Sequence, residues 1–199
     1  MNLPNKLTVL RIFLVPIFVI FVLSPGIPLH YLWAFLTFAA ASLTDHYDGK
    51  IARERNLITD FGKFLDPLAD KILVISALVC FIQLGLANVW CVLIIIAREF
   101  LVTSLRLIAA DNGVVLAANR WGKTKTASQM IAIIFILVVQ SIQEFVGVGT
   151  MSSIHFGSIA APTVFAVAGS VLIWIATFFA VLSGVIYLKQ NSSVINTTK

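Results

Sequence analysis

The sequence predicts an all-α integral membrane protein with six transmembrane helices and both termini in the cytoplasm. Its 199 residues are 59% hydrophobic and only 12% charged, whereas about a quarter of the residues of a soluble domain are charged. Long apolar runs recur along the chain, and only some of the connections between them contain basic residues. These observations exclude an ordinary soluble domain and a disordered chain. The two cysteines lie inside apolar runs, which excludes a disulfide scaffold.

Six apolar runs mark the expected helices, at residues 12–23, 31–43, 72–86, 89–110, 127–145 and 162–188. The first run extends toward residue 29 through Pro25, Gly26 and Pro28, and the second continues as a helix into a charged segment. Six spans of about 20 residues leave no room for a second, soluble domain. We therefore expect one membrane domain over residues 1–188 and a disordered cytoplasmic tail over 189–199.

The remaining runs differ in how they begin. A turn expected at residues 56–59 precedes the third run, and Pro67 allows either a helix that starts there with Asp66 as N-cap or an earlier start with a kink. Arg98 and Glu99 interrupt the fourth run. The fifth follows a basic segment, and the sixth is uniformly apolar.

The positions of the basic residues set the orientation. All fourteen lysines and arginines avoid the connections at residues 24–31, 84–90 and 144–162. With six spans, these connections lie on one side of the membrane and the basic segments on the other. The positive-inside rule places the basic side in the cytoplasm.

Four aspartates flank the turn between the second and third runs. Asp45 and Asp48 are three residues apart, and Asp66 and Asp70 are four apart, so each pair shares one face of a helix. If the two helices fold back on each other, the four carboxylates converge at the cytoplasmic membrane boundary. Charged groups near the hydrocarbon are costly and usually mark function.

Four close carboxylates repel one another unless a cation compensates them. A ligand set of oxygen atoms alone selects Mg²⁺ or Mn²⁺ rather than zinc. It suits two ions about 3.5–4 Å apart, which activate displacement at phosphorus. Small residues nearby, Gly49, Ala52 and Gly62, would let a phosphorylated ligand approach the backbone. The alternative is that the acids pair with neighbouring lysines and arginines at a solvated interface.

The complete pattern is D-x-x-D-G-x-x-A-R, eight further residues, and G-x-x-x-D-x-x-x-D, from Asp45 to Asp70. It resembles the signature of the CDP-alcohol phosphotransferase family. The resemblance implies six membrane helices, a homodimer, a two-metal site and displacement of CMP from a CDP-linked donor. It makes Asp70 a metal ligand and the general base. It also implies the following sites: Asp45, Asp48 and Asp66 for metal, and Gly49, Arg53 and Gly62 for CDP.

A second cluster of basic residues lies outside this signature. Arg98 and Arg106 are eight apart and share roughly one helix face. Arg98 needs a counter-charge or an aqueous cavity within a membrane helix, and adjacent Glu99 is not expected to face it. We interpret the cluster as a pocket for an acceptor's phosphate, formed by Arg98, Arg106, Arg120, Lys123 and Lys125. A solvated positive-inside loop is the alternative for the last three.

The segments at residues 95–100, 104–106 and 122–126, with the opening at residues 3–11, resemble the bacterial phosphatidylglycerophosphate synthase branch of the same family. The resemblance covers about two thirds of the chain and adds Asn5 and Thr8 to the CDP site. It implies a bacterial cell-membrane enzyme that transfers a phosphatidyl group from CDP-diacylglycerol to sn-glycerol 3-phosphate. Membrane lipid is then a partner and nucleic acid is not.

Other interpretations remain open on the sequence. Another member of the family would use inositol phosphate or phosphatidylglycerol as acceptor. A cation or proton transporter would also carry acids in its membrane helices, but the sequence has no inverted repeat or matching pair of broken helices. Loop 144–162 carries no recognisable motif.

Overall fold

A computed structural model describes the backbone of residues 3–54, 60–111 and 120–191, and their side chains except at 3–7, 45–54, 60–68, 70, 111, 148 and 156. The described residues form six long helices, one short helix and a two-stranded hairpin. In chain order these are α1 (Leu3–Leu23), α2 (His30–Glu54), α3 (Asp60–Gln83), α4 (Val89–Asp111), α5 (Arg120–Val146), α6 (Val148–Ser153), β1 (His155–Phe156), β2 (Ile159–Ala160) and α7 (Ala161–Gln190).

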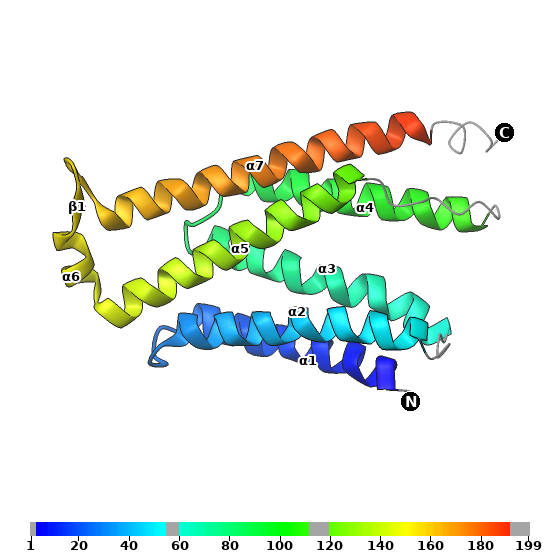
Figure 1. Cartoon of the computed structure of the whole chain (residues 1–199), viewed down its shortest axis with the longest axis horizontal. Helices are drawn as coiled ribbons and strands as arrows, with labels where there is room; N and C mark the ends of the chain where they lie inside the picture. Colours follow the sequence, from blue (N-terminus) through cyan, green and yellow to red (C-terminus); the bar gives the residue numbers. More distant parts are fainter. Residues whose placement is uncertain (1–2, 55–59, 112–119, 192–199) are drawn as a thin grey trace.

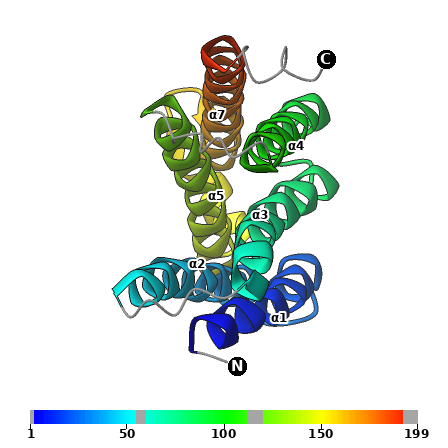
Figure 2. The ribbon, with the colours of Figure 1, turned by 90° about the vertical axis from the view of Figure 1, so that its right-hand side faces the viewer.

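The long helices are arranged in three layers of two. Helices α1 and α2 form one outer layer, α4 and α7 form the other, and α3 and α5 lie between them (Figures 1 and 2). Contacts join α1 to α2 and α3, α5 to α2 and α7, and α4 to α7. The buried core draws residues from all three layers, and within the first layer Phe18 of α1 packs on Phe38 of α2 with ring centroids 5.7 Å apart.

Turn and cap residues mark the ends of several helices. Helix α1 ends at Leu23, before the Pro25–Gly26 turn, so it does not continue toward residue 29. Gly85 follows α3 with a φ of 70°, a conformation that glycine adopts readily at helix C-termini. Asn88 Oδ1 then accepts a hydrogen bond of 2.9 Å from the Trp90 amide and caps α4.

Helix α3 begins at Asp60, which agrees with the earlier of the two starts that Pro67 allows. The turn expected at residues 56–59 lies outside the described residues. Helix α7 extends to Gln190, so residues 189 and 190, which were predicted to belong to the tail, are helical. Residues 192–199 of that tail also lie outside the described part.

The connection at 144–162 has structure that its sequence did not indicate. Helix α6 is followed by the antiparallel pairing of β1 with β2, with His155 opposite Ala160. Gly157 has a φ of 68° in the turn between the strands, a position where glycine avoids steric strain. This small structure lies at one end of the bundle, beside α5 and α7 (Figure 1).

The outer surface of the bundle is strongly apolar. Phe13, Trp90 and Phe145 are 66%, 68% and 78% exposed. By length and composition, α5 and α7 are each able to cross a membrane, and α1 and α3 contain shorter apolar stretches. These features agree with an all-α membrane protein.

The connections alternate between the two ends of the bundle. Helices α1, α3 and α5 begin, and α2, α4 and α7 end, toward the right-hand side of Figure 1. The basic segments therefore lie toward one end, and the connections without basic residues lie toward the other.

Candidate active site

The four aspartates lie on two consecutive helices. Asp45 and Asp48 belong to α2, and Asp66 and Asp70 belong to α3. Both helices are continuous through these positions, so the spacings of three and four place each pair on one helix face. The side chains of all four, and of Asn5, Gly49, Arg53 and Gly62, lie outside the described residues. Among the side chains that are described, no group of three or more histidines, cysteines or acids gathers as a metal site.

A cavity of about 140 Å³ is lined by residues one helical turn from Asp45 and from Asp70. Its walls include Ser42 of α2, three residues before Asp45, and Leu73 of α3, three residues after Asp70. Because residues three apart share a helix face, the faces that include positions 45 and 70 border the same cavity. Described side chains one turn away from the aspartates therefore show that α2 and α3 line one cavity here.

Helix α1 contributes a buried polar face to this region. Thr8 and Arg11 are each 1% exposed, and Arg11 lines the 140 Å³ cavity. Thr8 was predicted to bind CDP, whereas Arg11 was not assigned to a site. The spacing of three between them would have placed both on one face. A buried arginine at a membrane boundary usually marks a functional region.

A larger cavity, of about 530 Å³, is lined by basic and hydroxyl side chains from three helices. Helix α4 contributes Arg98 and Arg106, and α5 contributes Lys123, all three of which were predicted to bind a phosphate. The described wall also contains residues that were not predicted to belong to the phosphate site: Lys71, Thr103, Gly122 and Thr126. Cations and hydroxyl donors around an open cavity provide the chemistry to bind an anion.

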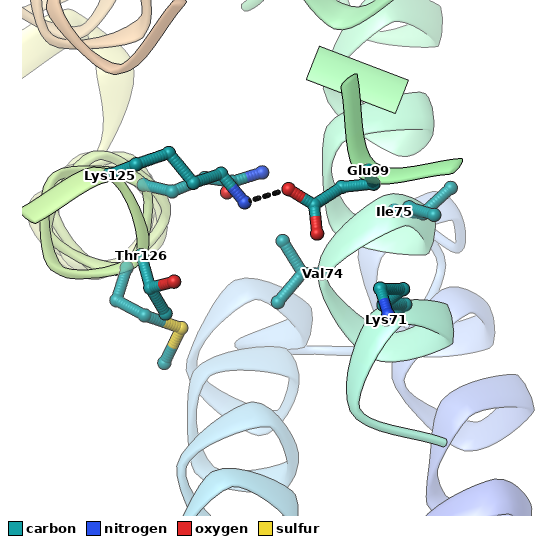
Figure 3. A pocket seen from close by; sticks show the side chains of 8 residues that line it. Lys71, Val74, Ile75, Glu99, Lys125 and Thr126 are labelled. Carbon is teal, nitrogen blue, oxygen red and sulfur yellow. Dashed lines mark hydrogen bonds and ion pairs between the residues drawn. The ribbon is translucent and has the colours of Figure 1, made fainter. Parts of the chain in front are cut away.

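Lys125 has different surroundings from Lys123. Its side chain is buried and donates to Glu99 Oε1. It lines a separate pocket of about 60 Å³ with Lys71, Glu99 and Gln129, where Figure 3 shows its ammonium group pointing at the carboxylate. In the structure, Lys125 therefore interacts with a carboxylate of the protein rather than lining the larger cavity.

Arg98 has both a counter-charge and a cavity beside it, and its place in a membrane helix requires one or the other. Arg98 Nη1 donates to Glu99 Oε1 at 3.0 Å, and the side chain also lines the 530 Å³ cavity. The expectation that these consecutive residues do not interact is wrong, because two long side chains can bend toward each other from adjacent positions. Arg120 is exposed at the start of α5 and is not among the described residues of the cavity wall.

Comparison with known proteins gives consistent results. A family model for CDP-alcohol phosphatidyltransferase matches residues 1–186. A Bacillus subtilis protein named CDP-diacylglycerol–glycerol-3-phosphate 3-phosphatidyltransferase is 43% identical over 208 residues, covering 99% of this chain and 98% of that protein. A Rickettsia bellii protein of the same name is 35% identical over 189 residues, 94% of each chain. A Mycobacterium tuberculosis protein named probable phosphatidylglycerophosphate synthase is 42% identical over 142 residues, 68% of this chain and 66% of that protein.

Proposed function

Because the chain belongs to the CDP-alcohol phosphatidyltransferase family, we propose that it transfers the phosphatidyl group of CDP-diacylglycerol to sn-glycerol 3-phosphate. The products are phosphatidylglycerophosphate, a precursor of phosphatidylglycerol and cardiolipin, and CMP. Relatives that match almost the whole chain are named for this donor and this acceptor, which supports the proposal. The same similarity sets aside the transporter alternative.

The observation that carries the proposal is the position of the 530 Å³ cavity. Arg98, Arg106 and Lys123 line this cavity, and so does Lys71 of α3. Lys71 directly follows Asp70 in the sequence. A cavity able to bind the acceptor's phosphate therefore reaches the helix that carries the proposed general base.

The donor set fits a pair of hard divalent cations. Carboxylates alone, spaced by one helical turn on α2 and on α3, are suitable ligands for Mg²⁺ or Mn²⁺. Asp45, Asp48, Asp66 and Asp70 would hold them. When bound, the ions would neutralise charge on the donor's pyrophosphate and on the departing CMP.

Different residues of the chain then bind the acceptor, accept its proton and bind the donor. Arg98, Arg106 and Lys123 hold the phosphate of glycerol 3-phosphate and direct its free terminal hydroxyl toward α3. Asp70 takes the hydroxyl proton as the hydroxyl oxygen bonds to the β-phosphorus. The bond from that phosphorus to the bridging oxygen breaks, and its electron pair leaves with CMP. Asn5, Thr8, Gly49, Arg53 and Gly62 bind the CDP portion, with buried Arg11 as a further cation beside them.

The proposed setting is a bacterial cell membrane, which the bacterial relatives support. All six long helices cross it, both termini are cytoplasmic, and the reaction takes place at the cytoplasmic boundary. The acyl chains of the donor then remain in the bilayer while its headgroup enters the polar end of the bundle. The apolar outer faces would be covered by lipid and by a second copy of the chain in a homodimer.

The test is an acceptor comparison with purified protein in detergent. CDP-diacylglycerol and Mg²⁺ or Mn²⁺ are supplied with glycerol 3-phosphate, inositol phosphate, phosphatidylglycerol or serine, and CMP release is measured. We expect release with glycerol 3-phosphate alone, and loss of release when a chelator is added. Release with a different acceptor, and not with glycerol 3-phosphate, would reassign the protein within its family.

A further inference from the structure

Helix α7 contacts Arg106 of the 530 Å³ cavity through a buried tyrosine. Arg106 Nε donates a hydrogen bond of 3.1 Å to Tyr187 Oη. The guanidinium carbon also lies 5.4 Å from the centroid of the tyrosine ring, within the range of a cation–π interaction. Tyr187 is only 2% exposed, so its ring is held by the packing of the bundle.

The same face of α7 also contacts Arg98. A Cβ atom at Gly184 would lie 3.1 Å from Arg98 Cγ, so the stem of Arg98 packs closely against the helix backbone. Gly184 and Tyr187 are three residues apart and share a helix face. Arg98 and Arg106 both line the cavity, whereas Gly184 and Tyr187 are not among the described residues of its wall. Helix α7 therefore supports both arginines from outside the cavity.

We propose that Tyr187 is a positioning residue for the acceptor phosphate, acting through Arg106. This inference rests on the proposed function. A guanidinium group has five N–H donors, and the contact with Tyr187 uses the one on Nε, which leaves the terminal nitrogens for the phosphate. Fixing a flexible side chain before the ligand arrives reduces the entropy lost on binding. Tyr187 thus gives the otherwise apolar last helix a specific part in acceptor recognition.

The test compares Tyr187→Phe with wild type in steady-state kinetics. The substitution keeps the buried ring and removes the hydroxyl that accepts from Arg106. We expect the KM for glycerol 3-phosphate to rise about five-fold, the effect of losing one hydrogen bond of ordinary strength. The kcat and the KM for CDP-diacylglycerol should stay within about two-fold of wild type, since ground-state binding of the acceptor is what changes. Tyr31→Phe, at the opposite end of the bundle, is the matched control.

A double-mutant cycle separates a positioning role from a structural one. If Tyr187 acts through Arg106, Tyr187→Phe should cause no further rise in this KM in an Arg106→Met background. An independent rise of the same size in that background would overturn the proposal. So would an unchanged KM in Tyr187→Phe, or a KM change equal to that of Tyr31→Phe.

A binding measurement distinguishes failure of this inference from failure of the proposed function. Glycerol 3-phosphate should raise the unfolding temperature of the wild type without any turnover, and Tyr187→Phe should reduce this rise at the same ligand concentration. If the wild type is inactive but the ligand stabilises it more than it stabilises Tyr187→Phe, the proposed reaction is contradicted and the positioning role of Tyr187 stands. An active wild type with equal stabilisation in both proteins would retain the reaction and reject the role of Tyr187.

Discussion

Lys123 and Lys125 are two residues apart on the same helix, and the structure gives them different environments. Lys123 is exposed and lines the 530 Å³ cavity, whereas Lys125 is buried against Glu99. Glu99 also accepts from Arg98, so a single carboxylate connects a buried lysine to an arginine of the cavity wall. Because Glu99 lines both the small pocket and the large cavity, its carboxylate also holds the Arg98 guanidinium in place at the proposed phosphate site.

Glu99→Gln should destabilise the protein and weaken the acceptor site. The variant deprives the buried Lys125 ammonium of this carboxylate, and breaking a buried ion pair from one side costs about 3–5 kcal/mol. We expect a lower unfolding temperature in detergent and a higher KM for glycerol 3-phosphate. Because adding Lys125→Met removes the buried charge, this double variant should recover most of the lost stability. Unchanged stability in Glu99→Gln would show that the ion pair contributes little.

At the scale of helices, an acid from α5 fixes the start of α2. Glu144 Oε1 accepts from the His30 amide at 3.0 Å, and Glu144 Oε2 accepts from the Tyr31 amide at 3.1 Å. The first amides of a helix lack partners within the helix, and a carboxylate is favoured there by the helix dipole. Glu144 therefore joins two helices at the end of the bundle opposite to the proposed active site.

Glu144→Ala should lower stability by about 1–2 kcal/mol, the usual cost of losing a helix N-cap. The matched control is Gln143→Ala, which removes a neighbouring polar side chain. Thermal unfolding in detergent measures the difference, and CMP release at low temperature should be close to wild type because the change is remote from the proposed site. Equal unfolding temperatures for the two variants would contradict the capping role.

The six long helices could be predicted because long apolar runs and helix breakers act locally. The position of each aspartate pair on one helix face could be predicted because spacings of three and four follow the helical period. In contrast, the roles of Glu144 and Tyr187 depend on residues 114 and 81 positions away, and no local pattern reveals such pairings. The different surroundings of Lys123 and Lys125 likewise depend on how α5 rotates against α4. The hairpin at 155–160 was missed because its strands have only two residues each.

At the scale of the whole molecule, the two ends of the bundle differ in charge. The end with the α2–α3 and α4–α5 connections carries the basic segments, and the end with α6 and the hairpin carries none of the lysines or arginines (Figure 1). The apolar exterior lies between them. This distribution supports a membrane orientation in which the proposed active site faces the cytoplasm.

Cysteine labelling in intact cells tests this orientation. Cys80 and Cys91 are buried, and replacing both by alanine provides a background without thiols. In this background, Ser158→Cys in the hairpin should react with a membrane-impermeant maleimide, and Gln190→Cys at the end of α7 should react only after the cells are permeabilised. Labelling of Gln190→Cys in intact cells would reverse the orientation.

The central claim is that phosphatidyl transfer depends on the carboxylate of Asp70 as part of a metal-binding set. The most direct measurement is CMP release by Asp70→Asn, beside Asp60→Asn, which makes the same change on the same helix outside the signature. We predict a loss on the order of 100-fold or more for Asp70→Asn, near-normal release for Asp60→Asn, and wild-type unfolding temperatures for both. Near-normal release by a folded Asp70→Asn protein would contradict the account.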